Sequence, residues 1–201
     1  MMYGVIRQYD IDPGQIDAIV HRCRERFLPI LSKAVGFVSW TLMDAGPAGL
    51  ITASVFDDEL KADYAAGWYK ENQAALALGR PQVTRGPVVT RSVVEHVPEG
   101  YGFLWRCPVR VSGIYEATHR IRDSLVPLIA ALPGFASYGA IDAGASTVVS
   151  LSIFKNREYA DAGNRQTVAW VNERLAECVA QPPEIIPAEI KLRTSTTAVT
   201  T

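Results

Sequence analysis

Apolar residues in the first half of the chain recur at the spacing of an amphipathic helix. At about 100° per residue they form one stripe along residues 16–31. Asp12 and Pro13 stand just before it, where a cap and a first-turn proline are favoured. The stripe consists of Ile16, Ile19, Val20, Cys23, Phe27, Ile30 and Leu31. A matching stripe predicts a helix in the second half, made of Ile114, Ala117, Thr118, Ile121, Leu125, Leu128 and Ile129.

Strand-like runs surround the first predicted helix at residues 3–9, 36–44, 50–56 and 88–94. A second helix is expected to run from Asp57 to about Leu78 and to end at Gly79. The order is βαββαβ, which is typical of the ferredoxin-like arrangement of a four-stranded sheet with two helices on one face.

Alternation along the third strand predicts which face the helices cover. Ile51, Ala53 and Val55 share one face, and it is wholly apolar, so we expect it under the helices. The second half repeats it with Val149, Leu151 and Ile153. The opposite face carries Thr52, Ser54 and Phe56 in the first half, and we expect the two such faces of the chain to cover each other.

An internal repeat relates the two halves at an offset of 98 residues. About fifteen residues are identical over about 54 aligned positions, where chance gives roughly three. Among the pairs are Tyr3-Gly4 with Tyr101-Gly102, His21-Arg22 with His119-Arg120, Gly36-Phe37 with Gly134-Phe135, and Asp44-Ala45-Gly46 with Asp142-Ala143-Gly144. The sequence therefore predicts repeats at residues 1–97 and 98–193, followed by a polar tail at 194–201. Two fused units would form a single-chain pseudo-dimeric α+β barrel.

Composition excludes several classes of function. The net charge is -1, which gives no basic footprint for nucleic acid or for a membrane surface. No apolar run approaches the roughly 20 residues that span a bilayer. Cys23, Cys107 and Cys178 lack metal-ligand or disulfide spacing, so we expect apolar packing roles and a cytoplasmic protein. Without clustered ligands or a glycine-rich loop, no metal, haem iron, nucleotide or other cofactor is expected.

Motifs in the second half resemble those of the antibiotic biosynthesis monooxygenase-like (ABM domain) family, in the dimeric α+β barrel superfamily. The matching residues are Pro133-Gly134-Phe135, Asp142-Ala143-Gly144, Ser152-Ile153-Phe154, Asn164-Arg165 and Ala169-Trp170-Val171 with Glu173. The first half resembles the family more loosely. The resemblance implies a cofactor-free oxygenase in which an Asn and a Trp on the second helix help to bind an aromatic substrate and oxygen.

Carried onto this chain, the resemblance points to Asn164 and Trp170. Six helical steps place them about 240° apart, so they share no face unless the helix starts after Asn164. The first half has Trp68 opposite Trp170 but Ala62 opposite Asn164. We therefore expect one working pocket, in the second half.

Tyr138 lies on a strand of that half and is expected to line the pocket with Trp170. Trp40 is its counterpart in the first half, and a packed core is at least as good an interpretation of both residues as a pocket. Packing is likewise the simpler role for Trp68 and Trp170. His21 and His119 fall on the polar side of their helices and are expected to be solvated surface residues.

Three functional readings remain open at this stage. The first is an enzyme related to the cofactor-free oxygenases, acting on a small hydrophobic or aromatic molecule. The second is a non-catalytic small-molecule-binding or stress-related barrel, and the third is a structural protein without a ligand. An open pocket with one or two polar groups would favour the first two.

Overall fold

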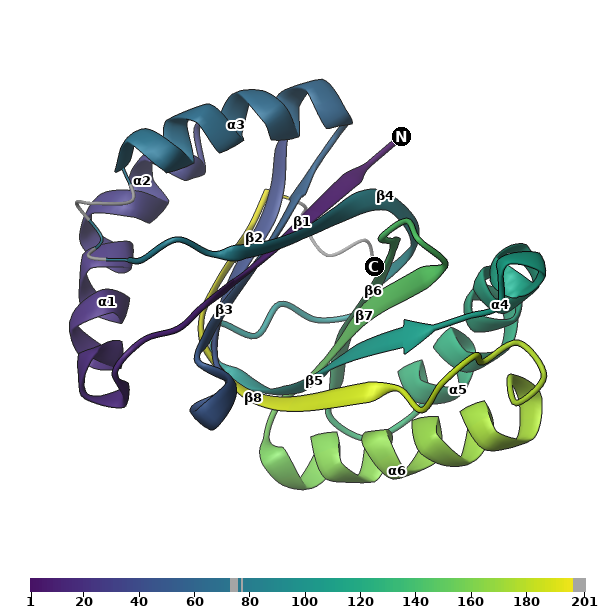
Figure 1. Ribbon diagram of the computed structural model, residues 1–201. Helices are drawn as coiled ribbons and strands as arrows, with labels where there is room; N and C mark the ends of the chain where they lie inside the picture. Colours follow the sequence, from purple (N-terminus) through teal and green to yellow (C-terminus); the bar gives the residue numbers. More distant parts are fainter. Residues whose placement is uncertain (73–75, 77, 197–201) are drawn as a thin grey trace. The chain divides into compact units, whose positions relative to one another are not determined.

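The computed structural model describes residues 1–72, 76 and 78–196, and for residues 68–72 it describes the backbone alone (Figure 1). The strands are β1 (Tyr3–Tyr9), β2 (Phe37–Asp44), β3 (Leu50–Phe56), β4 (Gln82–Val93), β5 (Gly100–Pro108), β6 (Phe135–Asp142), β7 (Thr147–Phe154) and β8 (Glu184–Ser195). The α-helices are α1 (Ile16–Arg22), α2 (Leu28–Leu31), α3 (Glu59–Asn72), α4 (Ile114–Arg120), α5 (Val126–Ala130) and α6 (Arg157–Arg174).

The strands hydrogen-bond in the closed order β1-β3-β2-β8-β5-β7-β6-β4, so the fold is a mixed α+β one with an eight-stranded antiparallel barrel. The chain divides into two compact units. Unit 1 contains Met1–Pro87 and the segment that starts at Ala188, and unit 2 contains Val88–Pro187. Strands β4 and β8 each begin in one unit and end in the other. The division into domains at 97/98 stays a prediction.

In unit 1, one face of the β1-β3-β2 sheet packs against α1, α2 and α3 (Figure 1). We call it the helix side of unit 1. The strand residues buried there include Val5, Tyr9, Trp40, Leu42, Leu50 and Phe56. Thr52 and Ser54 alternate with Leu50 and Phe56 along β3, so they also face the helices.

The predicted orientation of the third strand is therefore wrong. Ile51, Ala53 and Val55 point away from the helices, because the face that packs on them carries Leu50 and Phe56. Ile51 is nevertheless fully buried, so both faces of β3 are covered and polarity cannot distinguish them. Large aromatic side chains, which fill the space between helix and sheet, mark the helix side instead.

Unit 2 has the corresponding helix side, formed by β5, β6 and β7 under α4, α5 and α6 (Figure 1). Its buried strand residues include Phe103, Trp105, Cys107, Tyr138, Val148 and Phe154. Phe154 alternates with Ile153, so the orientation predicted for Val149, Leu151 and Ile153 is wrong for the same reason.

The strand registers of the two units match at the offset of 98 residues. Tyr3 pairs with Phe56 across β1 and β3, and Tyr101 pairs with Phe154 across β5 and β7. The β2–β3 ladder shifts register between Phe37 and Ser39, and the β6–β7 ladder shifts at the equivalent place, between Phe135 and Ser137.

Each first helix contains a π-helical turn, at Cys23–Phe27 and at Ile121–Leu125. Each turn ends two residues before a proline, Pro29 or Pro127. In a regular α-helix the proline ring would clash with the carbonyl four residues earlier, and the wider π turn moves that carbonyl away. The sequence stripe predicted the helix but not this turn.

Two other elements differ from expectation. Strand β4 begins at Gln82 rather than Val88, and Pro87 lies within it, just before a register shift between Val88 and Thr90 where the ladder passes from β1 to β6. Proline is tolerated at such irregularities. Helix α3 is described to Asn72. Its expected continuation to Leu78 falls partly on residues 73–75 and 77, outside the described part.

Candidate functional site

Helix α6 carries the polar residue singled out by sequence. It starts at Asn156, whose Oδ1 accepts a hydrogen bond of 3.0 Å from the backbone N–H of Tyr159. One face is buried, formed by Ala160, Gly163, Thr167, Trp170 and Val171. Asn164 therefore lies two turns inside the helix. The idea that the helix starts after Asn164 is wrong, because the cap is Asn156.

Asn164 is held by a tryptophan from the sheet. The indole Nε1–H of Trp105, on β5, donates a hydrogen bond of 3.0 Å to Oδ1 of Asn164. Indole N–H is a donor only, so the amide must present its oxygen to Trp105 and turn its two N–H donors the other way. Asn164 is half-buried and Trp105 is almost fully buried. The bond thus orients a polar group at the edge of the buried cluster that contains Trp105, Tyr138 and Trp170, which we call the aromatic layer.

Trp170 lies in the same buried cluster as Trp105 and Tyr138. Its Nε1–H donates to the Ser124 hydroxyl at 3.0 Å, which ties α6 to the π-helical turn of the first helix. The structure thus places Trp170, Tyr138 and Asn164 around one helix–sheet layer of unit 2. The tryptophan that hydrogen-bonds to Asn164 is nevertheless Trp105, while Trp170 hydrogen-bonds to Ser124.

Burial keeps two ionisable groups of this layer neutral. Desolvation raises the pKa of Tyr138 to about 12, although a hydrogen bond with Ser150 opposes that shift. Burial likewise raises the pKa of Cys107 to about 11, helped by the neighbouring Cys178. At neutral pH the first is therefore a phenol and the second a thiol, and neither serves as an anionic base. All three cysteines are free and buried, as expected from their apolar surroundings.

Unit 1 presents a different layer at the equivalent positions. Trp40 is fully buried, with its ring centroid 5.2 Å from that of Phe27. Ala62 stands where α6 has Asn164, and Arg7 stands where β5 has Trp105. Trp68 lies in α3, but its side chain is outside what the structure describes. The amide–indole pair therefore has no counterpart in unit 1.

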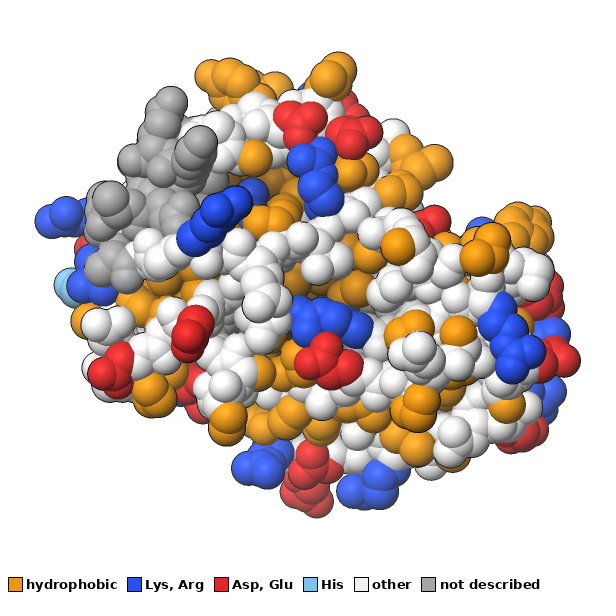
Figure 2. All heavy atoms as spheres, viewed as in Figure 1, with side chains coloured by type: hydrophobic (Ala, Val, Ile, Leu, Met, Phe, Trp, Pro, Cys, Tyr) orange, Lys and Arg blue, Asp and Glu red, His pale blue; other side chains and the backbone are white. Residues whose placement is uncertain are grey.

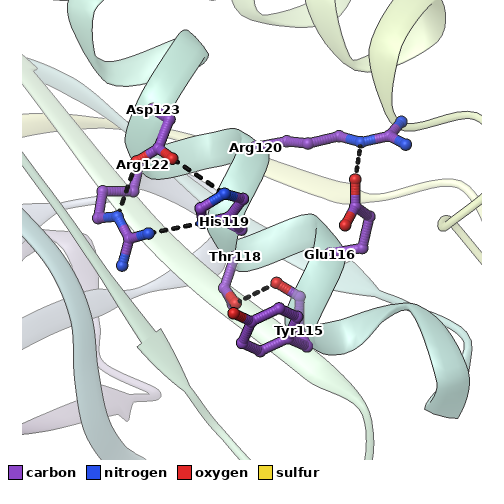
Figure 3. A network of polar contacts seen from close by, with 7 residues as sticks. All are labelled: Tyr115, Glu116, Thr118, His119, Arg120, Arg122 and Asp123. Atoms are coloured by element: carbon purple, nitrogen blue, oxygen red, sulfur yellow. Dashed lines mark hydrogen bonds and ion pairs between the residues drawn. The ribbon is translucent and has the colours of Figure 1, made fainter.

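The paired histidines are surface residues, as expected. His21 and His119 are both exposed. Figure 3 shows His119 between Arg122, whose Nη2 lies 2.6 Å from Nδ1, and Asp123, whose Oδ2 lies 3.2 Å from Nε2. The Tyr115 ring stacks on the imidazole, with centroids 6.1 Å apart. This network lies along one exposed helix and stands apart from the buried aromatic layer.

The surface carries charges of both signs. Acidic and basic side chains are interspersed on the face drawn in Figure 2. Among the described residues no group of three or more His, Cys, Asp or Glu side chains could hold a metal ion. No helix in that part of the chain is long and apolar enough to cross a bilayer.

Sequence reasoning missed Trp105. Trp105 has the same strand parity as Phe103 and Cys107, so the sequence alone could have placed all three on one face of β5. Its partner lies 59 residues away on another element, so no local spacing could reveal the pair.

The sequence matches no known family profile and no curated protein. Solved structures are similar along nearly the whole chain. A candidate monooxygenase from Lactobacillus acidophilus NCFM has a TM-score of 0.78 at 11% identity, covering 98% of each chain. A candidate monooxygenase from Fusobacterium nucleatum has a TM-score of 0.74 at 8% identity, covering 98% of this chain and 95% of that one.

An anthrone oxidase-like protein is similar with a TM-score of 0.63 at 13% identity, covering 98% of this chain and 94% of that one. At such low identity these likenesses show the fold alone. The chain has a monooxygenase-like α+β barrel fold.

Proposed function

We propose that this protein is a cofactor-free, ABM-type monooxygenase acting on a small hydrophobic, aromatic molecule, with its working site in unit 2. The observation that carries the proposal is the hydrogen bond that fixes the Asn164 amide against Trp105, at the edge of a layer that also contains Trp170 and Tyr138. We further propose that the halves are two ferredoxin-like repeats descended from one ABM-like unit. The matching strand registers support this.

The oriented amide suits stabilisation of a developing oxyanion. Because Trp105 occupies the Asn164 oxygen, the amide N–H groups do not face Trp105 and could donate hydrogen bonds to a bound molecule. A positioned donor stabilises negative charge that grows on a substrate oxygen during reaction. The indole and phenol rings of the layer supply the apolar surroundings that an aromatic substrate needs.

The neutral layer also constrains the substrate. Since Tyr138 and Cys107 remain protonated at neutral pH, neither can take a proton from the substrate, and a substrate that ionises readily by itself, such as an aromatic ketone with an acidic CH2 group, suits this layer. The substrate then supplies the electrons: its carbanion reduces O2, a C–O bond forms at that carbon, and loss of water leaves a carbonyl. The balance is CH2 plus O2 giving C=O plus H2O.

Anthrone is the probe for this chemistry, since its oxidation to anthraquinone consumes one O2 and releases one water. We expect the full chain to accelerate oxygen uptake over the background rate. Asn164→Asp keeps an acceptor for Trp105 but removes the amide donors, so kcat should fall by about 100-fold. Asn172→Asp makes the same chemical change at an exposed position of α6 and should leave the rate unchanged. Equal rates in both variants, or no uptake above background, would contradict the proposal.

The alternative is a binding protein without turnover. It draws support from the hydrogen bonds that the indoles of Trp105 and Trp170 form within the protein. These bonds hold the rings in place and use their only donors, so the rings would contact a ligand by apolar packing alone. Quenching of tryptophan fluorescence by anthraquinone, without oxygen uptake in the presence of anthrone, would favour this reading over the enzyme.

A further inference from the structure

Unit 1 buries two hydroxyl groups on its helix side. Thr52 is fully buried and Ser54 is almost so, and neither hydroxyl has a hydrogen-bond partner within the described part of the chain. Buried polar groups are nearly always paired, so two neighbouring exceptions on one strand require an explanation. An additional group that accepts hydrogen bonds from both would provide it.

Comparison with unit 2 shows how Thr52 comes to lack a partner. The equivalent of Thr52 is Ser150, which forms a side-chain hydrogen bond with Tyr138. The equivalent of Tyr138 in unit 1 is Trp40, which has no hydroxyl. The difference at this one position leaves the Thr52 hydroxyl without the partner that Ser150 has, although it is buried in the layer.

A guanidinium group belongs to the same layer. Arg7 is 5% exposed and lies directly opposite Thr52 in the β1–β3 ladder. Val5 and Tyr9, its alternate neighbours on β1, are both part of the helix-side core, so Arg7 shares that side. It replaces Trp105 of unit 2, and it introduces a permanent positive charge where the other unit has an aromatic ring.

The neighbouring side chains are apolar. Trp40 pairs with Ser54, and Leu42 pairs with Thr52 across β2 and β3. On the other side Arg7 pairs with Val83 of β4, which is 52% exposed, so the ladder row that contains Arg7 and Thr52 has a solvent-exposed residue next to Arg7. Two hydroxyl donors, a cation and an indole ring match a carboxylate carried on an aromatic or compact apolar body.

We infer that the helix side of unit 1 binds a small organic carboxylate, with Thr52 and Ser54 donating hydrogen bonds to its oxygens and Arg7 balancing its charge. This site is separate from the one proposed in unit 2 and does not depend on it. The two halves would then recognise different chemistry, a neutral aromatic molecule in unit 2 and an anionic one in unit 1.

Calorimetric titration of the full chain with sodium benzoate tests the site. We expect one benzoate to bind, and benzamide and inorganic phosphate to bind about tenfold more weakly or worse, because each lacks either the charge or the ring. Thr52→Val and Ser54→Ala should each weaken benzoate by about tenfold or more. Arg7→Met should abolish binding. Arg85→Met removes a more exposed positive charge of unit 1 and should have no effect on benzoate.

A second readout does not require ligand. Because the Thr52 hydroxyl lacks a partner, Thr52→Val should raise the melting temperature of the free protein while it weakens benzoate. Asn164→Asp should leave benzoate binding unchanged, which separates this site from that of unit 2. The inference is overturned if benzoate does not bind, if Thr52→Val and Ser54→Ala leave its affinity intact, or if Thr52→Val lowers the melting temperature, since the last result would mean that the hydroxyl already has a partner such as water. The benzoate titration of the unmodified protein and the Thr52→Val and Ser54→Ala variants decide the inference even if Arg7→Met fails to fold.

Discussion

Gly163 of α6 lies directly against the ring of Phe154 on β7. A Cβ atom added to this glycine would come within 2.2 Å of Cζ of the phenylalanine. Phe154 cannot move aside easily, because it is fully buried and packs edge-on against Phe135 at 5.6 Å. The helix and the sheet of unit 2 therefore approach each other at a point where only glycine fits.

Gly163→Ala should destabilise the protein by about 1–3 kcal/mol, because overpacking outweighs the higher helix propensity of alanine. Gly67→Ala is the matched control. Gly67 is a helical, exposed glycine of α3, and a Cβ there would meet nothing within 4 Å. That change should stabilise by up to about 1 kcal/mol. Urea unfolding measures both, and a stabilising Gly163→Ala would contradict the packing described here.

Trp170 and Ser124 should be energetically coupled through their 3.0 Å hydrogen bond. In a double-mutant cycle of Trp170→Phe and Ser124→Ala, we expect a coupling energy of about 0.5–1.5 kcal/mol. The control cycle pairs Ser124→Ala with Trp105→Phe, whose hydrogen bond goes to Asn164 instead, and it should be additive within about 0.5 kcal/mol. Additivity in the first cycle would show that the bond contributes nothing.

Alkaline pH should destabilise the protein through Cys23. Burial raises the pKa of this thiol from 9.0 to about 12. Between these values the unfolded chain loses the proton while the folded chain keeps it, so the free energy of unfolding falls by about 1.4 kcal/mol per pH unit from this group. Cys23→Ala should make the decline less steep between pH 9 and 11, measured by urea unfolding at each pH. Ile19→Val, a change without a titrating group, should lower stability at all pH values and leave the slope unchanged.

The last strand of the chain is expected to be indispensable for unit 1. Residues Ser39 to Asp44 of β2 pair with residues 189–195 of β8. A chain that ends at Pro187 exposes this edge of β2, and we expect it to lose its cooperative melting transition or to aggregate. A chain that ends at Thr196 keeps every strand residue and should melt like the full protein, as followed by circular dichroism. Normal melting of the shorter chain would contradict this dependence.

The elements of the fold could be predicted from sequence because their signals are local. The stripe from Ile16 to Leu31 and the turn at Asp44-Ala45-Gly46 depend on residues a few positions apart, and the structure has a helical segment and a hairpin there. The orientation of β3 could not be predicted in this way. Both of its faces are buried, so the usual contrast between polar and apolar residues carried no information, and Phe56 was the better guide.

The candidate site was predictable only in part. Asn164, Trp170 and Tyr138 were singled out and lie around one layer, but the bond that orients Asn164 comes from a residue 59 positions earlier. The helical spacing that separates Asn164 from Trp170 was right about geometry. It could say nothing about a partner on the sheet, since that contact exists only after the chain has folded.

Strands β4 and β8, which each begin in one unit and end in the other, have a consequence for how this gene could change over evolutionary time. If the gene were split between the halves, the first product would carry Val88–Val93, which completes the β6 edge of the second, and the second would carry the end of β8, which completes β2 of the first. Each polypeptide would act as an obligate folding partner for the other. We therefore expect fission of the gene to be tolerated only where both fragments are made together. Loss of either half alone would leave the other half without one of its strands.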